Sequence, residues 1–233
     1  MGRRALVFGA TGAIGRAVAS ALSEAGNDVV GTTRSRSAAD APNGLVAVDP
    51  FDGAVGLAAL GGAPYDAVVW AQGTNVNDSV LEFDVDVHLE VLKANCVFVA
   101  ATLAELLRCN LVRDGARLCI ISSIWQTIAR ERKLSYTVSK AALAGLVHSA
   151  AADLAGRGIL VNAVLPSVTD TAMTRAMLSP DQIDRFASAT GFGRLTSLDD
   201  VASTVAFLSS EQNTGVTGQS IAVDLGYSTV RDV

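Results

Sequence analysis

The amino-acid sequence predicts one doubly wound α/β domain, built on a parallel sheet of seven strands with helices on both faces. Seven short runs rich in β-branched residues alternate with longer segments of helical periodicity. The runs are apolar almost without interruption, which is typical of parallel strands that are buried on both faces. The chain has 233 residues and is 50% hydrophobic, which suits a single domain over residues 1–233.

The predicted strands lie at residues 5–8, 28–33, 45–48, 67–70, 117–121, 160–164 and 220–223. Right-handed crossovers between them give an open Rossmann-type sheet, whose ligand crevice lies beyond the carboxyl ends of the strands. Functional residues are therefore expected directly after strands. The longest irregular-looking segment, residues 171–195, has an amphipathic pattern. It is interpreted either as a lid over a substrate or as a surface helix covering the sheet.

Charge and composition exclude several classes of protein and site. The formal net charge is −5 and lysine and arginine do not cluster, so a surface for nucleic acid is not expected. The three cysteines lack CxxC spacing and the two histidines stand alone, so we expect a reducing compartment and no metal site. No run reaches the roughly 18 uninterrupted apolar residues of a membrane span, and the first residues match neither a leader nor a myristoylation signal. We expect a cytoplasmic protein with a small-molecule partner.

The first predicted strand leads into a glycine-rich turn, followed by a helical pattern over residues 16–25. Glycines let the backbone approach a pyrophosphate closely, and the start of the helix offers unpaired N–H groups. Three glycines alone are equally typical of a tight strand-to-helix turn, but their place between strand and helix favours dinucleotide binding. The expected contacts are Gly9, Thr11, Gly12, Ala13, Ile14 and Gly15.

The end of the second predicted strand indicates which dinucleotide is bound. An acidic residue there would bind the 2′-hydroxyl of NAD and repel a 2′-phosphate. The sequence instead reads Gly31-Thr-Thr-Arg34-Ser35-Arg36, with two cations and several hydroxyls. This favours NADP(H) over NAD(H), with Arg34 and Ser35 as contacts. The alternative is that both arginines simply face water.

A candidate catalytic group follows the fifth predicted strand. Ser123 closes that strand, and Tyr136 and Lys140 lie four residues apart, on one face of a long predicted helix. A phenol with a free pKa of about 10 becomes a better proton shuttle beside an ammonium group. The hydroxyl of Ser123 is placed to polarise a carbonyl. Alone, the pair is typical of a packed tyrosine beside a solvated lysine, but its position after the fifth strand favours catalysis.

With these motifs the sequence resembles the short-chain dehydrogenase/reductase family over essentially its whole length. The motifs are the spacing of Ser123, Tyr136 and Lys140, the run Ser139-Lys-Ala-Ala142, the segment Val161-Asn-Ala-Val-Leu-Pro166, Thr217-Gly-Gln219 and Val223-Asp224. The resemblance implies an NADP(H)-dependent carbonyl reductase or alcohol dehydrogenase. Such an enzyme moves a hydride between nicotinamide and a ketone or secondary alcohol, with Tyr136 as general acid/base. It also implies a homodimer or homotetramer, formed through the long helix pair and the final strand.

Further roles follow from the resemblance alone. Asn95 falls where the family has an asparagine that holds a water relaying protons to the lysine. The remaining implied cofactor contacts are Asp49 at the adenine, Ala71 and Gly73 after the fourth strand, and Pro166, Val168 and Thr171 around the nicotinamide carboxamide.

The sequence also departs from the family pattern. The glycines are spaced Gly-x-x-Gly-x-x-Gly, which shifts the expected phosphate contacts by up to a residue. Trp70-Ala71-Gln72-Gly73 stands where Asn-Asn-Ala-Gly is usual, so the asparagine side chains that stabilise this turn are missing.

The substrate pocket is expected from Ile124, Trp125 and Gln126, from the stretch after Gly73 and from residues 171–195, with Trp125 as an apolar wall. Which carbonyl compound enters it does not follow from the sequence. Two other classes of function remain open at this point. One is a lyase, dehydratase or epimerase that uses the same tyrosine and lysine, and the other is a non-catalytic nucleotide-sensing subunit.

Overall fold

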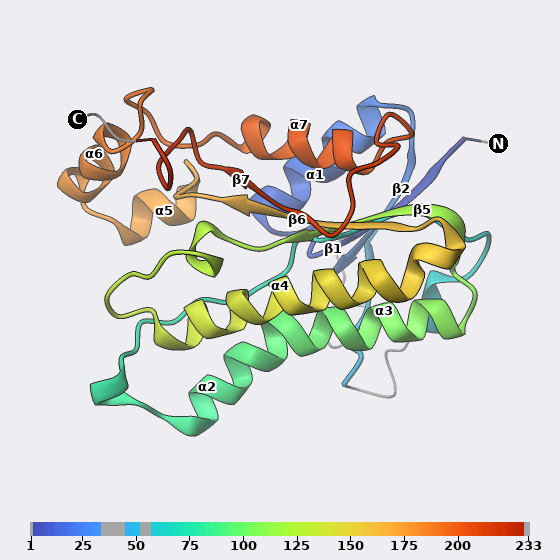
Figure 1. Ribbon diagram of the computed structural model, residues 1–233, viewed down its shortest axis with the longest axis horizontal. Helices are drawn as coiled ribbons and strands as arrows, with labels where there is room; N and C mark the ends of the chain where they lie inside the picture. The colour runs from blue at the N-terminus through green and yellow to red at the C-terminus, as the bar shows by residue number, and fades with distance from the viewer. Residues whose placement is uncertain (1, 34–44, 52–56, 231–233) are drawn as a thin grey trace.

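A computed structural model describes residues 2–33, 45–51 and 57–230 of the protein (Figure 1). Its centre is a seven-stranded parallel sheet in the order β3-β2-β1-β4-β5-β6-β7. The strands are β1 (Arg4–Phe8), β2 (Asp28–Thr33), β3 (Leu45–Ala47), β4 (Tyr65–Trp70), β5 (Val112–Ile121), β6 (Leu160–Pro166) and β7 (Ser220–Val223). All seven predicted strands and the doubly wound α/β class are confirmed. The largest difference is in β5, which begins at Val112 rather than at residue 117.

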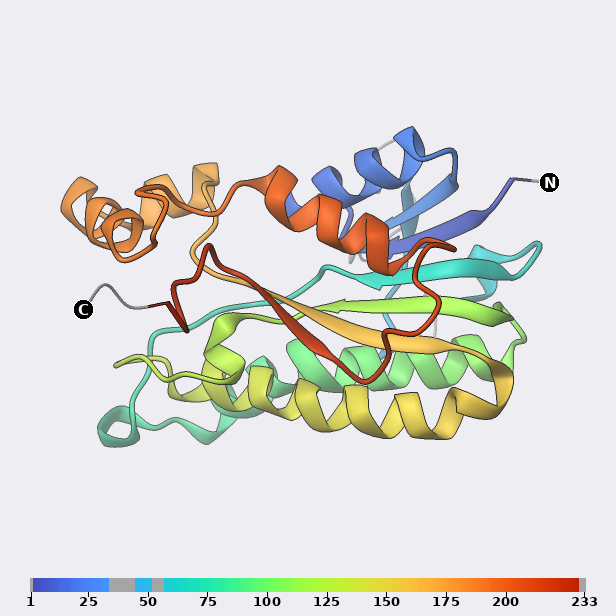
Figure 2. The ribbon, with the colours of Figure 1, turned by 45° about the horizontal axis from the view of Figure 1, so that its top comes forward.

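Helices cover both faces of the sheet, as the apolar strands required (Figure 2). The α-helices are α1 (Ala13–Glu24), α2 (Val85–Leu92), α3 (Phe98–Arg108), α4 (Leu134–Leu154), α5 (Ala172–Met177), α6 (Pro180–Ser188) and α7 (Leu198–Leu208). Side chains alternate along each strand, so Leu6 and Phe8 pack in the layer of α3 and α4, whereas Ala5 and Val7 pack in the layer of α1 and α7. The order of strands reverses between β1 and β4, and a ligand crevice is expected beyond their carboxyl ends.

Trp70, which stands in place of a family asparagine, is a core residue. Its ring stacks on Phe8 with a centroid distance of 5.7 Å, and Phe98 of α3 meets Phe8 edge-on at the same distance. The indole N–H of Trp70 donates a hydrogen bond of 2.8 Å to Oγ1 of Thr102. The position that could have carried a polar turn residue therefore anchors α3 to the sheet.

The segment Val85–Arg108 is long and apolar enough to cross a membrane, judged by length and composition alone, with a mean hydropathy of 1.4 over 18 residues. It comprises α2, a π-helical turn η4 (Lys93–Val97) and α3. Its inner residues Phe98, Val99 and Leu106 pack into the layer between the sheet and α4. The core helix of a soluble protein can pass the same test of length and composition.

Residues 171–195 are more regular than the sequence indicated. They contain α5 and α6, and α6 begins with a capping box in which Ser179 and Gln182 bond each other's backbone, with Pro180 at its first turn. The segment that looked irregular in the sequence thus contains two short helices, which agrees with the surface-helix interpretation of its amphipathic pattern. Whether the segment moves as a lid stays a prediction.

Candidate active site

The glycine turn between β1 and α1 packs backbone against backbone so closely that Gly9 and Gly15 have no room for a side chain. Gly9 has φ +76°, and a Cβ added there would lie 2.7 Å from the backbone nitrogen of Gln72. A Cβ on Gly15 would lie 2.1 Å from the carbonyl oxygen of Gly9. Helix α1 begins at Ala13 after Gly12, and within the described parts of the chain no side chain caps its first N–H groups. A cradle without side chains at an uncapped helix start fits the pyrophosphate of a dinucleotide.

The adenine end of the dinucleotide is expected beyond the carboxyl ends of β2 and β3. Arg34 and Ser35, the residues that favour NADP(H), lie outside the described residues. Asp49 follows β3, which neighbours β2, and its carboxylate accepts a hydrogen bond of 2.9 Å from the N–H of Phe51. This places Asp49 at the same edge of the sheet as the end of β2.

Ser123, Tyr136 and Lys140 come together beyond the end of β5. Ser123 directly precedes the short helical turn η5 (Ile124–Gln126), and its hydroxyl lies close enough to the Tyr136 phenol to influence the pKa of that phenol. The ammonium nitrogen of Lys140 lies 5.7 Å from the centroid of the Tyr136 ring and donates 3.0 Å to the carbonyl of Ile121. Lys140 is 3% exposed and Ser123 is 7% exposed. The arrangement is a shielded hydroxyl–phenol–ammonium group.

Burial controls the acidity of this group. Burial raises the pKa of the Tyr136 phenol, and the nearby hydroxyl of Ser123 lowers it in part. Burial also lowers the pKa of Lys140 to about 8, an effect that nearby Cys96 partly offsets. We expected from the sequence that Lys140 would make the phenol more acidic. In the protein without its cofactor, burial has the larger effect on the phenol pKa, so the lowering by Lys140 and a bound nicotinamide cation stays a prediction.

Asn95 lies in the π-helical turn η4 and is 1% exposed. Its side-chain oxygen accepts 2.7 Å from the N–H of Thr74, and its amide donates 3.0 Å to the Thr74 carbonyl and 2.9 Å to Oγ of Ser139. Ser139 in turn donates 2.8 Å to the carbonyl of Tyr136. Sequence reasoning missed Thr74 and the structural role of Ser139. The Ser-Lys-Ala-Ala run that contains Ser139 was the available signal.

Gly73 is the one residue of the family's Asn-Asn-Ala-Gly turn that this sequence keeps, and its surroundings leave little room for a side chain. A Cβ at this position would lie 3.1 Å from Oδ1 of Asn95 and 3.7 Å from Nζ of Lys140. The neighbouring Ala71 continues β4, and its N–H donates 2.9 Å to the carbonyl of Phe8. Any side chain at position 73 would therefore crowd the proposed catalytic groups.

The residues expected around the carboxamide follow β6. Pro166 ends β6 and pairs with Val223 of β7, and Val168 follows two residues later. Thr171 caps α5, with its hydroxyl oxygen 3.1 Å from the N–H of Thr174. Part of the hydrogen-bonding capacity of Thr171 is thus used within the chain.

Comparison with known proteins identifies the family. A family model described as enoyl-(acyl carrier protein) reductase matches residues 61–228. The 3-oxoacyl-(acyl-carrier-protein) reductases of Salmonella typhimurium and Escherichia coli K12 are each 30% identical over 243 residues, covering 97% of this chain and 97% of the relative. The chain belongs to the short-chain dehydrogenase/reductase family. It is therefore an oxidoreductase, and the family implies a nicotinamide cofactor.

Solved structures of other short-chain dehydrogenases/reductases agree with this fold. A family protein from Francisella tularensis superposes with a TM-score of 0.86 at 25% identity, covering 97% of this chain and 98% of the other. A short-chain dehydrogenase/reductase from Serratia marcescens gives a TM-score of 0.84 at 26% identity, with coverage of 97% and 98%.

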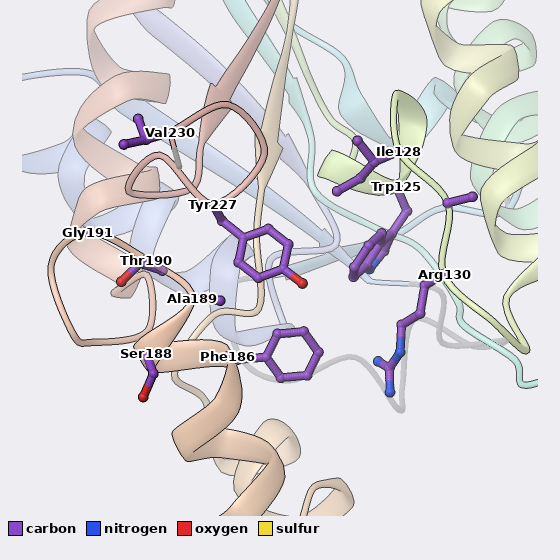
Figure 3. A pocket seen from close by; sticks show the side chains of 11 residues that line it. Trp125, Ile128, Arg130, Phe186, Ser188, Ala189, Thr190, Gly191, Tyr227 and Val230 are labelled. Atoms are coloured by element: carbon purple, nitrogen blue, oxygen red, sulfur yellow. The ribbon is translucent and has the colours of Figure 1, made fainter. Parts of the chain in front are cut away.

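A cavity of about 990 Å³ opens in this short-chain dehydrogenase/reductase near Ser123 (Figure 3). The described residues that line it are Trp125, Ile128, Ala129, Arg130, Phe186, Ser188, Ala189, Thr190, Gly191, Tyr227 and Val230. The lining does not include Ser123 itself, but Trp125 links the two, because its backbone N–H donates 3.3 Å to Oγ of Ser123.

The expectations for this pocket are met in part. Trp125 and residues of the 171–195 segment line the cavity as expected. Ile124 does not, because it is 1% exposed in the core, and Gln126 instead donates 2.8 Å to Oγ of Ser220. The stretch after Gly73 contributes to a different hollow of about 490 Å³, which includes residues 78–82. Sequence reasoning missed Arg130 and Tyr227, which carried no motif.

Proposed function

We propose that this short-chain dehydrogenase/reductase is an NADP(H)-dependent carbonyl reductase or alcohol dehydrogenase of the cytoplasm, with Tyr136 as its general acid/base. The observation that carries the proposal is the convergence of the Ser123 hydroxyl, the Tyr136 phenol and the buried ammonium of Lys140 next to a cavity. The names of the relatives support reduction of a carbonyl group.

The proposed mechanism assigns one task to each side chain. When bound, the nicotinamide supplies a hydride to the carbonyl carbon, or accepts one from the alcohol carbon. The hydroxyl of Ser123 orients and polarises the substrate oxygen. Burial raises the pKa of Tyr136, so the phenol holds its proton at neutral pH and can donate it to that oxygen during reduction. The nearby charge of Lys140 favours the phenolate that remains.

Asn95 and Ser139 are positioning residues in this proposal. Their hydrogen bonds connect the turn after β4 to the first turns of α4, which carry Tyr136 and Lys140. The Thr74 carbonyl, in the turn after β4, and the Tyr136 phenol, at the start of α4, are thereby connected through Asn95 and Ser139. The family resemblance also implies that Asn95 holds a water molecule that relays protons to Lys140, and this remains a proposal.

The preference for NADP(H) is supported by the residues that follow β2. The strand ends at Thr33, and the sequence continues with Arg34 and Ser35 rather than with an acidic residue. A cation and a hydroxyl suit a 2′-phosphate. The turn at Gly9 and the open start of α1 suit the pyrophosphate of either dinucleotide.

We further propose that the protein forms a homodimer through its helix pair, with a second copy of this chain as the partner. Val85 and Leu89 of α2 are 56% and 52% exposed, and Val138 of α4 is 40% exposed. An apolar stripe on a helical layer is typical of an interface. Strand β7, at the edge of the sheet, is the second surface that a tetramer would use. Sedimentation velocity should give the mass of a dimer or tetramer, and a monomer at micromolar concentration contradicts the proposal.

A substrate panel tests the proposed activity. The protein is incubated with NADPH or NADH and with ketones, 3-oxoacyl thioesters, quinones or keto sugars, and nicotinamide absorbance is followed together with product analysis. We expect consumption of NADPH with formation of the secondary alcohol from at least one class. Conversion of a compound without net change in nicotinamide absorbance would indicate a lyase, dehydratase or epimerase and would contradict the proposal.

A further inference from the structure

The cavity next to Ser123 has a largely aromatic lining with one charged side chain. Three of its walls are aromatic: Trp125 of η5, Phe186 of α6 and Tyr227 after β7. The described lining contains one cation, Arg130, and no carboxylate. Apolar walls with few polar groups are typical of small-molecule sites, in which the polar groups fix the orientation of the ligand.

The aromatic rings form a coherent surface. Trp125 and Tyr227 meet edge-on with a centroid distance of 6.3 Å, and Phe186 and Tyr227 lie 5.9 Å apart with 37° between their planes. Figure 3 shows Tyr227 and Phe186 facing the side of the cavity formed by Trp125 and Arg130. These rings come from three segments far apart in the sequence. Such surfaces favour a flat ligand, because ring-on-ring contact adds to simple burial of apolar area.

Arg130 is the polar group that this surface leaves available. Its guanidinium carbon lies 5.3 Å from the centroid of the Phe186 ring, a cation–π contact. Among described residues it has no salt-bridge partner, whereas Arg132, two residues later, pairs with Glu82 at 3.1 Å. A guanidinium stacked on a ring keeps its N–H donors free for a carboxylate or phosphate.

We infer that the substrate is an anionic carbonyl compound with a flat unsaturated or aromatic body, whose acidic group binds Arg130 while its ring packs among Trp125, Phe186 and Tyr227. The inference rests on the proposed function and specifies its substrate class. The carbonyl faces Ser123 and Tyr136, and the acidic group lies at the other end of the molecule. A flexible neutral chain would use neither the rings nor the guanidinium.

Binding to the NADP⁺-saturated protein tests the inference, because no ketone can be reduced in that complex. The probes are 4-acetylbenzoate and its methyl ester, which share a ring and a ketone but differ in charge, and 4-oxopentanoate, which is anionic but flexible. Isothermal titration calorimetry measures each dissociation constant. We expect 4-acetylbenzoate to bind about tenfold or more tightly than either comparator, as expected for a charge-assisted hydrogen bond and ring packing.

Variants separate the two parts of the inference. Arg130→Gln should abolish the preference for the acid over its ester, and the matched control Arg132→Gln should retain it. Phe186→Leu should weaken the binding of 4-acetylbenzoate and its ester several-fold and leave the binding of 4-oxopentanoate unchanged. Circular dichroism and NADP⁺ affinity establish that each variant is folded.

Three results would overturn the inference: equal binding of acid and ester, a preference that survives in Arg130→Gln, or no measurable binding of 4-acetylbenzoate. Binding of 4-oxopentanoate as tight as that of 4-acetylbenzoate overturns the requirement for a flat body. Failure of the proposed function looks different. In that case the acid binds with the expected preference, but no compound in the panel consumes NADPH.

Discussion

Asn95 and Thr74 are joined by a pair of hydrogen bonds, 2.7 Å from the Thr74 N–H to the asparagine side-chain oxygen and 3.0 Å from its amide to the Thr74 carbonyl. The Asn95 side chain thus bonds both backbone groups of Thr74, as a neighbouring strand would. The π-helical turn η4 holds Asn95 in this position, since its wider winding interrupts the regular path between α2 and α3. The proposed active site therefore rests on a local irregularity of the helix.

The first prediction concerns the phenol. Tyr136→Phe removes the only group proposed to exchange a proton with the substrate oxygen, and we expect kcat to fall by at least about a hundredfold, the lower range for general acid catalysis. NADP(H) affinity should change less than about threefold, because the proposed pyrophosphate site lies at the glycine turn. Steady-state kinetics and cofactor titration check both.

The control for that experiment is Tyr65→Phe. The hydroxyl of Tyr65 donates a hydrogen bond of 3.1 Å to the Leu60 carbonyl in the core. Losing this bond should lower the free energy of unfolding by about 1 kcal/mol with kcat unchanged. Activity of Tyr136→Phe equal to the wild type would remove the phenol from the mechanism.

The second prediction concerns pH. Burial lowers the pKa of Lys140 to about 8 in the folded protein, below its ordinary value of 10.5. Between these values the unfolded chain binds more protons than the folded one, so the free energy of unfolding rises with pH from about 8 to 10.5. Below pH 8 the buried charge reduces stability.

Lys140→Met should lack this rise. Urea unfolding at several pH values measures the free energy of unfolding of wild type and variant. The difference between the two free energies should shift in favour of the wild type by roughly 2 to 3 kcal/mol from pH 7.5 to pH 10.5. The exposed Lys93→Met serves as control and should run parallel to the wild type. Parallel curves for Lys140→Met and wild type would show that Lys140 titrates normally.

The fold could be predicted largely because its signals are local and repeated. Each strand is a short apolar run, and the motif around Tyr136 and Lys140 lies within one turn of a single helix. Arg130 and Tyr227 could not be predicted, since nearly a hundred residues separate them and only the packing of α6 and the segment after β7 brings them to one cavity. The Tyr136 phenol shows the same limit, because spacing indicates a neighbouring charge but not the extent of burial.

The third prediction concerns the glycine turn. A Cβ on Gly15 would lie 2.1 Å from the Gly9 carbonyl oxygen, so Gly15→Ala must displace the backbone of the turn. We expect its free energy of unfolding to fall by about 2 kcal/mol or more, as for overpacking at a tight contact. At Gly12 the same Cβ would make an ordinary contact of 3.4 Å, and φ is −72°. Gly12→Ala is therefore the matched control, and equal destabilisation of both variants without cofactor would contradict the argument.

The fourth prediction concerns cofactor choice. Arg34→Ala should weaken NADPH binding about tenfold or more and NADH binding less than twofold, because only NADPH carries the 2′-phosphate that a guanidinium can bind. Fluorescence titration with both dinucleotides measures the two constants. Arg36→Ala is the comparison variant and should have the smaller effect. Equal losses for NADPH and NADH in Arg34→Ala would defeat the assignment of NADP(H).

The fifth prediction follows from Gln72, which stands where the family has alanine. Its side chain is buried, the residue being 8% exposed, and neither its amide nitrogen nor its amide oxygen has a hydrogen-bond partner among the described residues. An unpaired buried polar group destabilises the fold by about 1 to 3 kcal/mol, whereas an apolar group of the same shape does not. Gln72→Met keeps the length of the side chain and removes the amide. It should raise the free energy of unfolding of the cofactor-free protein by roughly 1 to 2 kcal/mol.

Gln72→Ala is the informative companion, since it removes the amide but also leaves a void. Its stability should therefore lie below that of Gln72→Met. Because the backbone of Gln72 lies against Gly9, cofactor affinity is measured for both variants. A stabilised Gln72→Met with unchanged NADP(H) affinity means that the amide is only a flaw in packing. If Gln72→Met is instead less stable than the wild type, the amide has partners in solution and the argument from its burial is wrong.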